Sequence, residues 1–137
     1  MQMTFINPEA LGAPRGYSNG VLVEGGRLLF VAGQIAWDTE QRIVSREFSE
    51  QFAQALGNVV AVVRAAGGAA TDIAQLRIYV TDKRAYQSSL KQVGAVYREL
   101  MGRHYPAMVL VEVAALVEDR AQVEIEAIAC LPAVESK

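Results

Sequence analysis

The sequence predicts a single α+β domain, residues 1–137, with a mixed sheet that carries two helices on one face. Apolar and polar residues alternate near both ends of the chain, as they do in strands. Between these regions, apolar residues recur at three- and four-residue steps, as they do in helices. The predicted order is therefore ββαβαββ, and two helices can cover only one face of a sheet this wide.

The composition is that of a globular protein, with 52% hydrophobic and 20% charged residues. The net charge is −2 and no run of Lys or Arg forms a stripe, so nucleic acid is an unlikely partner. The one cysteine, Cys130, excludes an intrachain disulfide and fits a reducing compartment. Because no secretory signal and no uncharged run of about 18 residues occur, we expect a cytoplasmic protein without a membrane partner.

The N-terminal part predicts an irregular segment followed by a hairpin. Residues 1–16 contain two prolines and two glycines, which break regular structure. Residues 17–23 and Arg27–Gln34 alternate as strands, and the turn at residues 24–26 between them predicts that they pair. Residues 35–44 form a loop that holds Trp37, the only tryptophan.

The middle of the chain predicts a helix, a strand and a second helix. The first helix begins near Ser45, a candidate N-cap, and stops at the glycine pair 67–68. Alternation returns over residues 73–81. Asp82 is the expected cap of the second helix, and Gly102 its end.

Residues 106–129 predict two strands joined by the polar link 118–120. The second strand has an apolar face, with Glu124 and Glu126 opposite. On this prediction, Glu112, Met108 and Leu110 share the acidic face, which meets either solvent or another subunit. The apolar neighbours of the acids favour a subunit. The tail, residues 132–137, is expected to fray.

Several motifs occur together in order: YSNGV (17–21), LFVAGQI (29–35), QALGNV (54–59), AAG (65–67), YVTD (79–82), VEVA (111–114) and VEIEAIA (123–129). The chain thereby resembles the Rid/YjgF family of reactive intermediate deaminases, over about residues 17–131. The resemblance implies a chorismate-mutase-like fold and a homotrimer, with the sheets lining a central barrel and small-molecule clefts between subunits. It implies hydrolysis of enamines and imines, such as 2-aminoacrylate, to a 2-oxo acid and ammonia, without a cofactor or metal.

The resemblance also implies the site. Glu124 matches the glutamate that orients the attacking water, and Tyr17 and Gly33 match a pocket tyrosine and a turn glycine. Substrate contacts are then expected from Tyr17, Gly33, Gln34, Trp37, Met108 and Leu110. The family's carboxylate-binding arginine is absent, because its Pro-Ala-Arg pattern reads Pro106-Ala107-Met108 here. Ala32 and Gly94 also depart from the family's usual serine and asparagine.

Each candidate has a structural alternative. Glu124 could be a structural acid, Met108 core filler, Tyr17 a tyrosine at the barrel edge, and Trp37 a cover for the core rather than a cleft wall. His104, the only histidine, could transfer protons, although an exposed loop position is expected. A metal site is not expected, because no second His or Cys stands at ligand spacing. Arginines that could replace the missing clamp, or be ordinary surface charges, are Arg15, Arg77 and Arg120.

Three functions remain open from the sequence. The first is an enamine/imine deaminase whose substrates are larger or lack the carboxylate, because methionine cannot pair with an anion. The second is a trimer that binds a small metabolite without converting it. The third is an RNA-directed activity, endoribonuclease or translation inhibitor, which the acidic balance disfavours.

Overall fold

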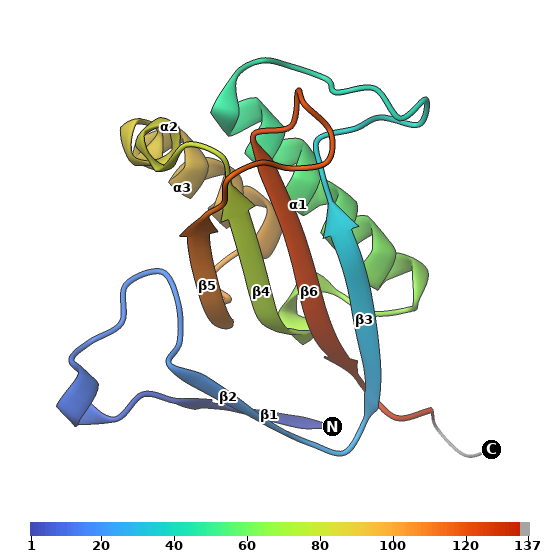
Figure 1. Cartoon of the computed structure of the whole chain (residues 1–137). Helices are drawn as coiled ribbons and strands as arrows, with labels where there is room; N and C mark the ends of the chain where they lie inside the picture. The colour runs from blue at the N-terminus through green and yellow to red at the C-terminus, as the bar shows by residue number, and fades with distance from the viewer. Residues whose placement is uncertain (135–137) are drawn as a thin grey trace.

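The computed structural model describes residues 1–134, and it confirms the α+β class (Figure 1). Four strands form a mixed sheet in the order β3-β6-β4-β5: β3 (Arg27–Gln34), β6 (Val123–Leu131), β4 (Ile73–Val80) and β5 (Ala107–Glu112). The helices, all on one face of this sheet, are α1 (Phe48–Ala65), α2 (Lys83–Ser88) and α3 (Leu90–Met101). A separate two-stranded sheet pairs β1 (Gln2–Ile6) with β2 (Gly20–Glu24).

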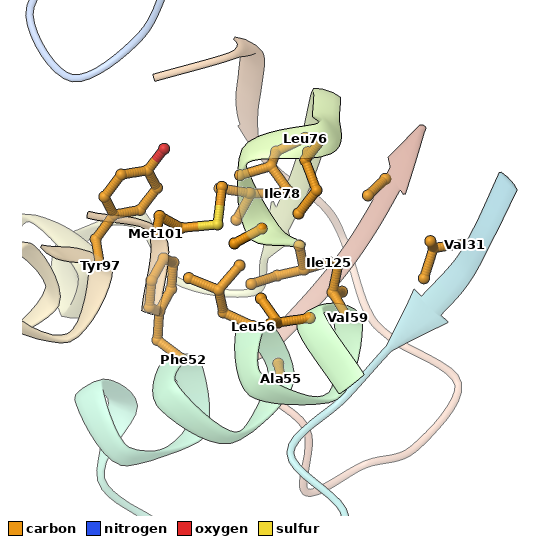
Figure 2. Packing of buried hydrophobic residues seen from close by; sticks show 14 of the residues in the cluster. Val31, Phe52, Ala55, Leu56, Val59, Leu76, Ile78, Tyr97, Met101 and Ile125 are labelled. Carbon is orange, nitrogen blue, oxygen red and sulfur yellow. The ribbon is translucent and has the colours of Figure 1, made fainter. Parts of the chain in front are cut away.

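The core lies between the four-stranded sheet and the helices, as the apolar periodicities predict. Residues 123, 125, 127 and 129 of β6 are all buried on the helix side, as the alternation predicts. Side chains of α1 point at the strands, and Figure 2 shows Leu56 and Val59 among them. Gln51 is the polar exception. Its amide donates to the carbonyls of Ser45 and Arg120, and its oxygen accepts from Gln122 N–H, so α1 holds both loops at this end of the sheet.

The predicted hairpin of residues 106–129 is wrong, because β4 lies between β5 and β6. β5 runs parallel to β4, and β6 runs antiparallel to it. β5 ends at Glu112 and β6 begins at Val123, so the connection between them is longer than the tight loops that join paired neighbouring strands. A connection of this length can pass over a strand, and α2 and α3 supply the crossover that the parallel pair β4–β5 requires.

The N-terminal prediction is also corrected. The segment expected to be irregular contains β1 and a short 3₁₀ helix, Glu9–Leu11. The strand predicted from residue 17 begins at Gly20, and it pairs with β1 rather than with β3. At the turn, Gly25 and Gly26 both have positive φ, and a side chain at Gly26 would meet the Leu131 carbonyl. The two glycines make a tight turn between β2 and β3, but these strands belong to different sheets and do not pair with each other.

Helix ends are confirmed in part. Asp82 accepts a hydrogen bond from Arg84 N–H, and Gly102 ends α3 with a positive φ, as expected. Ser45 does not cap α1, since it accepts from Glu47 N–H one turn before the helix begins. The second predicted helix is two helices, separated at Ser89. The neighbouring Ser88 hydroxyl donates to the Ala85 carbonyl, a local bond that competes with helix continuation.

Two further observations complete the fold. Pro132–Val134 have no regular structure, and the rest of the predicted frayed tail lies outside the described residues. Within residues 1–134, no helix combines the length and the apolar character needed to cross a bilayer.

Candidate functional site

The candidate residues fall on the two faces of the sheet. Met108 opposes Leu76 and Leu110 opposes Ile78, and these β4 residues are buried beneath the helices. Glu124 opposes Tyr79, which points to the open face. The prediction that Met108, Leu110 and Glu112 share a face with Glu124 and Glu126 is therefore wrong. The inserted β4 sets the register of each strand separately, and a shift of one residue exchanges the faces.

Tyr17 is held near Met108 by the residue that follows it. The Ser18 hydroxyl donates to the Tyr105 carbonyl at 2.6 Å, and Ser18 N–H donates to the Pro106 carbonyl at 3.0 Å. Ser18 also bridges Ala107 at the start of β5, and it is buried. These bonds fix the loop before β2 against the strand that carries Met108, as a cleft wall requires.

A cavity of about 470 Å³ lies where this loop, β5, α2 and α3 meet. Tyr17, Met108 and Leu110 all line it, so the structure brings these three predicted contacts together. The remaining wall is largely aromatic and aliphatic, contributed by Phe52, Ile78, Tyr86, Leu90, Val93, Tyr97 and Tyr105. Figure 2 shows Phe52, Ile78 and Tyr97 beside the core. The shape and lining are those of a small-molecule site.

On the open face, Glu124 lies directly against Gly33. A Cβ placed on Gly33 would stand 2.9 Å from the carboxyl carbon and from Oε1 of Glu124. A side chain at this position would therefore require the Glu124 carboxylate to move from where it lies. Gly33 stands in β3 where its pairing with β6 shifts register between Val31 and Gln34, so it belongs to a bulge rather than to a turn. Bulges of this kind re-aim backbone groups next to functional sites.

The three acids of the predicted face differ in their hydrogen-bond partners. Glu126 accepts from the Tyr79 hydroxyl at 2.6 Å and lies 3.6 Å from Arg77. That hydrogen bond is the main reason why the pKa of Tyr79 is raised above 10.0. Glu112 accepts from Lys83 N–H at the start of α2. Within residues 1–134, the half-buried Glu124 carboxylate is the one of these three that makes no hydrogen bond and no ion pair, so it can accept from a water or a ligand.

Gln34 and Trp37 lie away from the Met108 cavity. Gln34 is half-buried near Gly33, and its amide donates to the Ala32 carbonyl. Trp37 is half-buried in the loop after β3, and its carbonyl accepts from Asn58 Nδ2 at 3.1 Å. Neither side chain lines the cavity that holds Met108, so their predicted substrate contacts would require a second subunit.

The three candidate replacements for the missing arginine are separated by the fold. Arg15 lines the cavity beside Tyr17 and Met108. Arg77 is on the open face next to Glu126, and Arg120 is at the far end of the sheet, where its carbonyl accepts from Gln51. A fourth arginine was missed: Arg98 of α3 also lines the cavity. The available signal was its position one helical turn after Gly94, which leaves space on the same helix face.

His104 is buried, which corrects the expectation of an exposed loop histidine. Its Nε2 lies 2.6 Å from the Ile73 carbonyl, so Nε2 carries the proton. The ring also meets Phe5 of β1 edge to face. These contacts connect β1 to the end of α3, and they indicate a structural role. No group of three or more His, Cys, Asp or Glu that could hold a metal occurs among residues 1–134.

Comparison with known proteins agrees with this geometry. The family model described as Endoribonuclease L-PSP matches residues 7–131. A 2-iminobutanoate/2-iminopropanoate deaminase from Salmonella typhimurium is 35% identical over 94% of this chain and 98% of its own. A RutC family protein from Pyrococcus horikoshii is 36% identical over 78% of this chain and 82% of its own.

Solved structures agree as well. A Rid family protein, YyfB, from Yersinia pestis has a TM-score of 0.85 and 32% identity, covering 96% of this chain and 100% of that one. The YjgF gene product from Escherichia coli has a TM-score of 0.65 and 34% identity, covering 90% and 92%. The chain therefore belongs to the Rid/YjgF family, whose matching model is described as Endoribonuclease L-PSP.

Proposed function

We propose that this chain is an enamine/imine deaminase that works in clefts between subunits of a homotrimer, with its specificity altered at Met108. The observation that carries the proposal is Glu124, a half-buried carboxylate that lies against Gly33 and has no protein partner among residues 1–134. Glu126 on the same face is already engaged by Tyr79, whereas the oxygens of Glu124 are reached by solvent and are free to accept a hydrogen bond from a water or a substrate. The named deaminase from Salmonella typhimurium supports the reaction type.

A second subunit is part of the proposal because the two halves of the site lie on opposite faces of one sheet. The Met108 cavity is on the helix side, and Glu124 is on the open side. The open face also exposes Leu28 by 60% and Phe30 by 70%. Apolar side chains in such a patch favour association, and a neighbour docked there would bring its own cavity toward Glu124.

The chemistry follows from one carboxylate and one water. Glu124 accepts a hydrogen bond from the water and takes its proton as the oxygen attacks the imine carbon. The C–O bond forms while the C=N π bond breaks, which gives an amino alcohol. Glu124 returns that proton to the nitrogen, and it then carries the hydroxyl proton to the amino group as the C–N bond breaks, which releases ammonia and leaves the carbonyl. Imine and water together balance carbonyl and ammonia.

Met108 sets the proposed specificity. It stands where the family's arginine would hold a carboxylate through two parallel hydrogen bonds, and its thioether offers no donor. The flexible side chain adapts to apolar groups of varied shape. We therefore expect poor turnover of 2-aminoacrylate and better turnover of bulkier imines.

The test is an imine-hydrolysis assay with Glu124→Gln and its matched control Glu126→Gln, which changes the same residue type on the same strand and face. Imines are generated in situ by an amino-acid oxidase, from small and bulky amino acids. We expect Glu124→Gln to lower turnover about 10²–10⁴-fold, as loss of a general base does, with Glu126→Gln close to wild type. Unchanged turnover in Glu124→Gln would remove this residue from the chemistry.

A trimer that binds a metabolite without converting it is the second candidate, and Met108 in the cavity is the observation that favours it. The experiment that separates the two is a thermal-shift screen with product analysis. A stabilising ligand recovered intact after long incubation, with no turnover of any imine, would favour binding. Conversion of the ligand would exclude this candidate.

A further inference from the structure

The charges of the Met108 cavity are confined to two arginines. Of the lining residues only Arg15 and Arg98 are ionised at neutral pH, and no Asp or Glu is among them. Both arginines are exposed, and neither forms an ion pair within residues 1–134. A cavity bearing two unpaired positive charges, in a protein of net charge −2, selects for an anionic ligand.

Gly94 lies directly beside one of these charges. A Cβ placed on Gly94 would lie 3.4 Å from Nη1 of Arg98, so the guanidinium lies over the helix backbone at this glycine. A long side chain at residue 94 would occupy the same space. Gly94 has ordinary helical geometry, so its turn-forming freedom does not explain its presence. A Cβ at residue 94 would be in ordinary van der Waals contact with the guanidinium, whereas a side chain as large as leucine would compete with Arg98 for this part of the cavity wall.

The other arginine is positioned by the loop that Ser18 fixes. Arg15 precedes Tyr17 by two residues, and the bonds from Ser18 to Tyr105 and Pro106 hold this loop at the cavity. The hydroxyls of Tyr17 and Tyr86 make no hydrogen bond within residues 1–134, so they too can donate to a ligand. Below these polar groups lies the apolar floor of Met108, Leu110 and Ile78.

We propose that Arg15 and Arg98 are the anion-binding residues of this cavity, and that they hold the carboxylate of a ligand whose apolar body rests on Met108. The carboxylate clamp is then displaced from β5 to α3 and the N-terminal loop, rather than lost. The ligand class is a 2-oxo or 2-imino acid with a branched or aromatic side chain. Naming the acid as a substrate rests on the proposed deaminase function, whereas the anion site itself does not.

The test is calorimetric binding of 4-methyl-2-oxopentanoate, of its uncharged methyl ester and of pyruvate. Arg98→Gln and Arg15→Gln each remove one charge, and the matched control Arg103→Gln removes an exposed charge outside the cavity. We expect each cavity variant to weaken binding of the acid about tenfold and to leave binding of the ester unchanged. The control Arg103→Gln should bind the acid as the wild type does. The acid should also bind more weakly at high salt in the wild type, but not in the double variant.

Gly94→Leu is an independent variant that keeps both arginines. By filling the space over residue 94 it should displace Arg98, and it should weaken binding of the acid as Arg98→Gln does. Equal affinity for acid and ester, or equal effects of Arg98→Gln and Arg103→Gln, would overturn the anion site.

Turnover is measured on the same variants to keep the two proposals apart. Acid binding that depends on both arginines, without hydrolysis of any imine, would support the anion site and contradict the deaminase. Hydrolysis that is insensitive to both arginines would support the deaminase and contradict the assignment of Arg15 and Arg98 to the carboxylate of its substrate.

Discussion

The two faces of the four-stranded sheet differ in how completely the chain itself covers them. The helix face is closed: Leu56, Leu76 and Ile125 have no measurable exposure, and their packing is complete within one chain. The open face carries Phe30 at 70% exposure beside a polar row of Arg77, Tyr79 and Glu126. One face therefore stabilises the fold, and the other is left for interaction.

The candidate chemistry follows this division. The cavity with Arg15, Arg98 and Met108 opens at the edge of the packed side, where rigid helices and strands can hold a ligand. Glu124 stands on the open side, and no other residue in the described part of the chain bonds to its carboxylate. Because the sheet separates these groups, the proposed site requires an assembly to bring them together. The following predictions test this division, from the largest expected effect to the smallest.

Phe30→Glu should prevent association through the open face. In the proposed trimer this residue is covered by a neighbour, and an unpaired buried charge costs several kcal/mol at each interface. We expect smaller particles in analytical ultracentrifugation, loss of imine hydrolysis, and a retained far-ultraviolet circular dichroism spectrum. Leu11→Glu, at a residue 65% exposed in the 3₁₀ helix, is the control and should stay assembled. A Phe30→Glu protein of unchanged mass would contradict the assembly.

Leu56→Ala should destabilise the packing between the helices and the closed face. Truncating a leucine with no exposure leaves a cavity and lowers the free energy of unfolding by about 2–5 kcal/mol, measured by urea titration. Leu28→Ala on the open face is the matched comparison. Its effect should vary with protein concentration, because it acts through association, whereas the effect of Leu56→Ala on the fold should be present at every concentration. Equal effects that ignore concentration would remove the distinction between the faces.

Met108→Arg should sharpen the assignment of the cavity. A guanidinium at residue 108 restores a donor for small carboxylates, and about 1–3 kcal/mol of added binding corresponds to a gain of about 5-fold to 150-fold in kcat/KM for 2-aminoacrylate. The bulky imines should lose turnover, since the apolar floor is gone. Met108→Leu keeps the volume and should change neither. If Met108→Arg gains nothing on small substrates, Met108 does not stand at the specificity position.

Tyr79→Phe should have the smallest effect and a characteristic pH dependence. At pH 7 it removes the hydrogen bond to Glu126, at a cost of about 1 kcal/mol on this partly exposed face. In the folded protein the pKa of Tyr79 is raised above 10.0, chiefly by that bond. The unfolded chain then loses its proton first, so the stabilisation is complete below about pH 10 and is lost as the pH rises through the folded pKa.

Free energies of unfolding at pH 7 and above pH 10 measure this effect. The free energy of unfolding of Tyr79→Phe should fall less steeply with rising pH than that of the wild type. Some fall should remain, because burial also raises the pKa of Tyr97. An identical pH profile in the two proteins would mean that the Tyr79–Glu126 bond does not form.

Local patterns predicted the parts of this molecule that depend on neighbouring residues. The period of α1, the cap at Asp82, the stop at Gly102 and the buried alternation of β6 are all short-range, and all are confirmed. The family motifs singled out Glu124, Gly33, Tyr17 and Met108. Tyr17 and Met108 do meet at one cavity, and Glu124 and Gly33 do meet on one face.

Only the tertiary structure decided which strands are neighbours and which faces they share. Alternation says that residues 108 and 110 lie together, but not whether they lie with Glu124 or with the helices. Inserting β4 between β5 and β6 settled that relation through long-range pairing. Helix packing placed Arg98 in the cavity and His104 in the interior, because it decides which side chains that are distant in the sequence meet. Sequence alone thus determined the segments and the chemical groups, whereas packing determined which groups can act together.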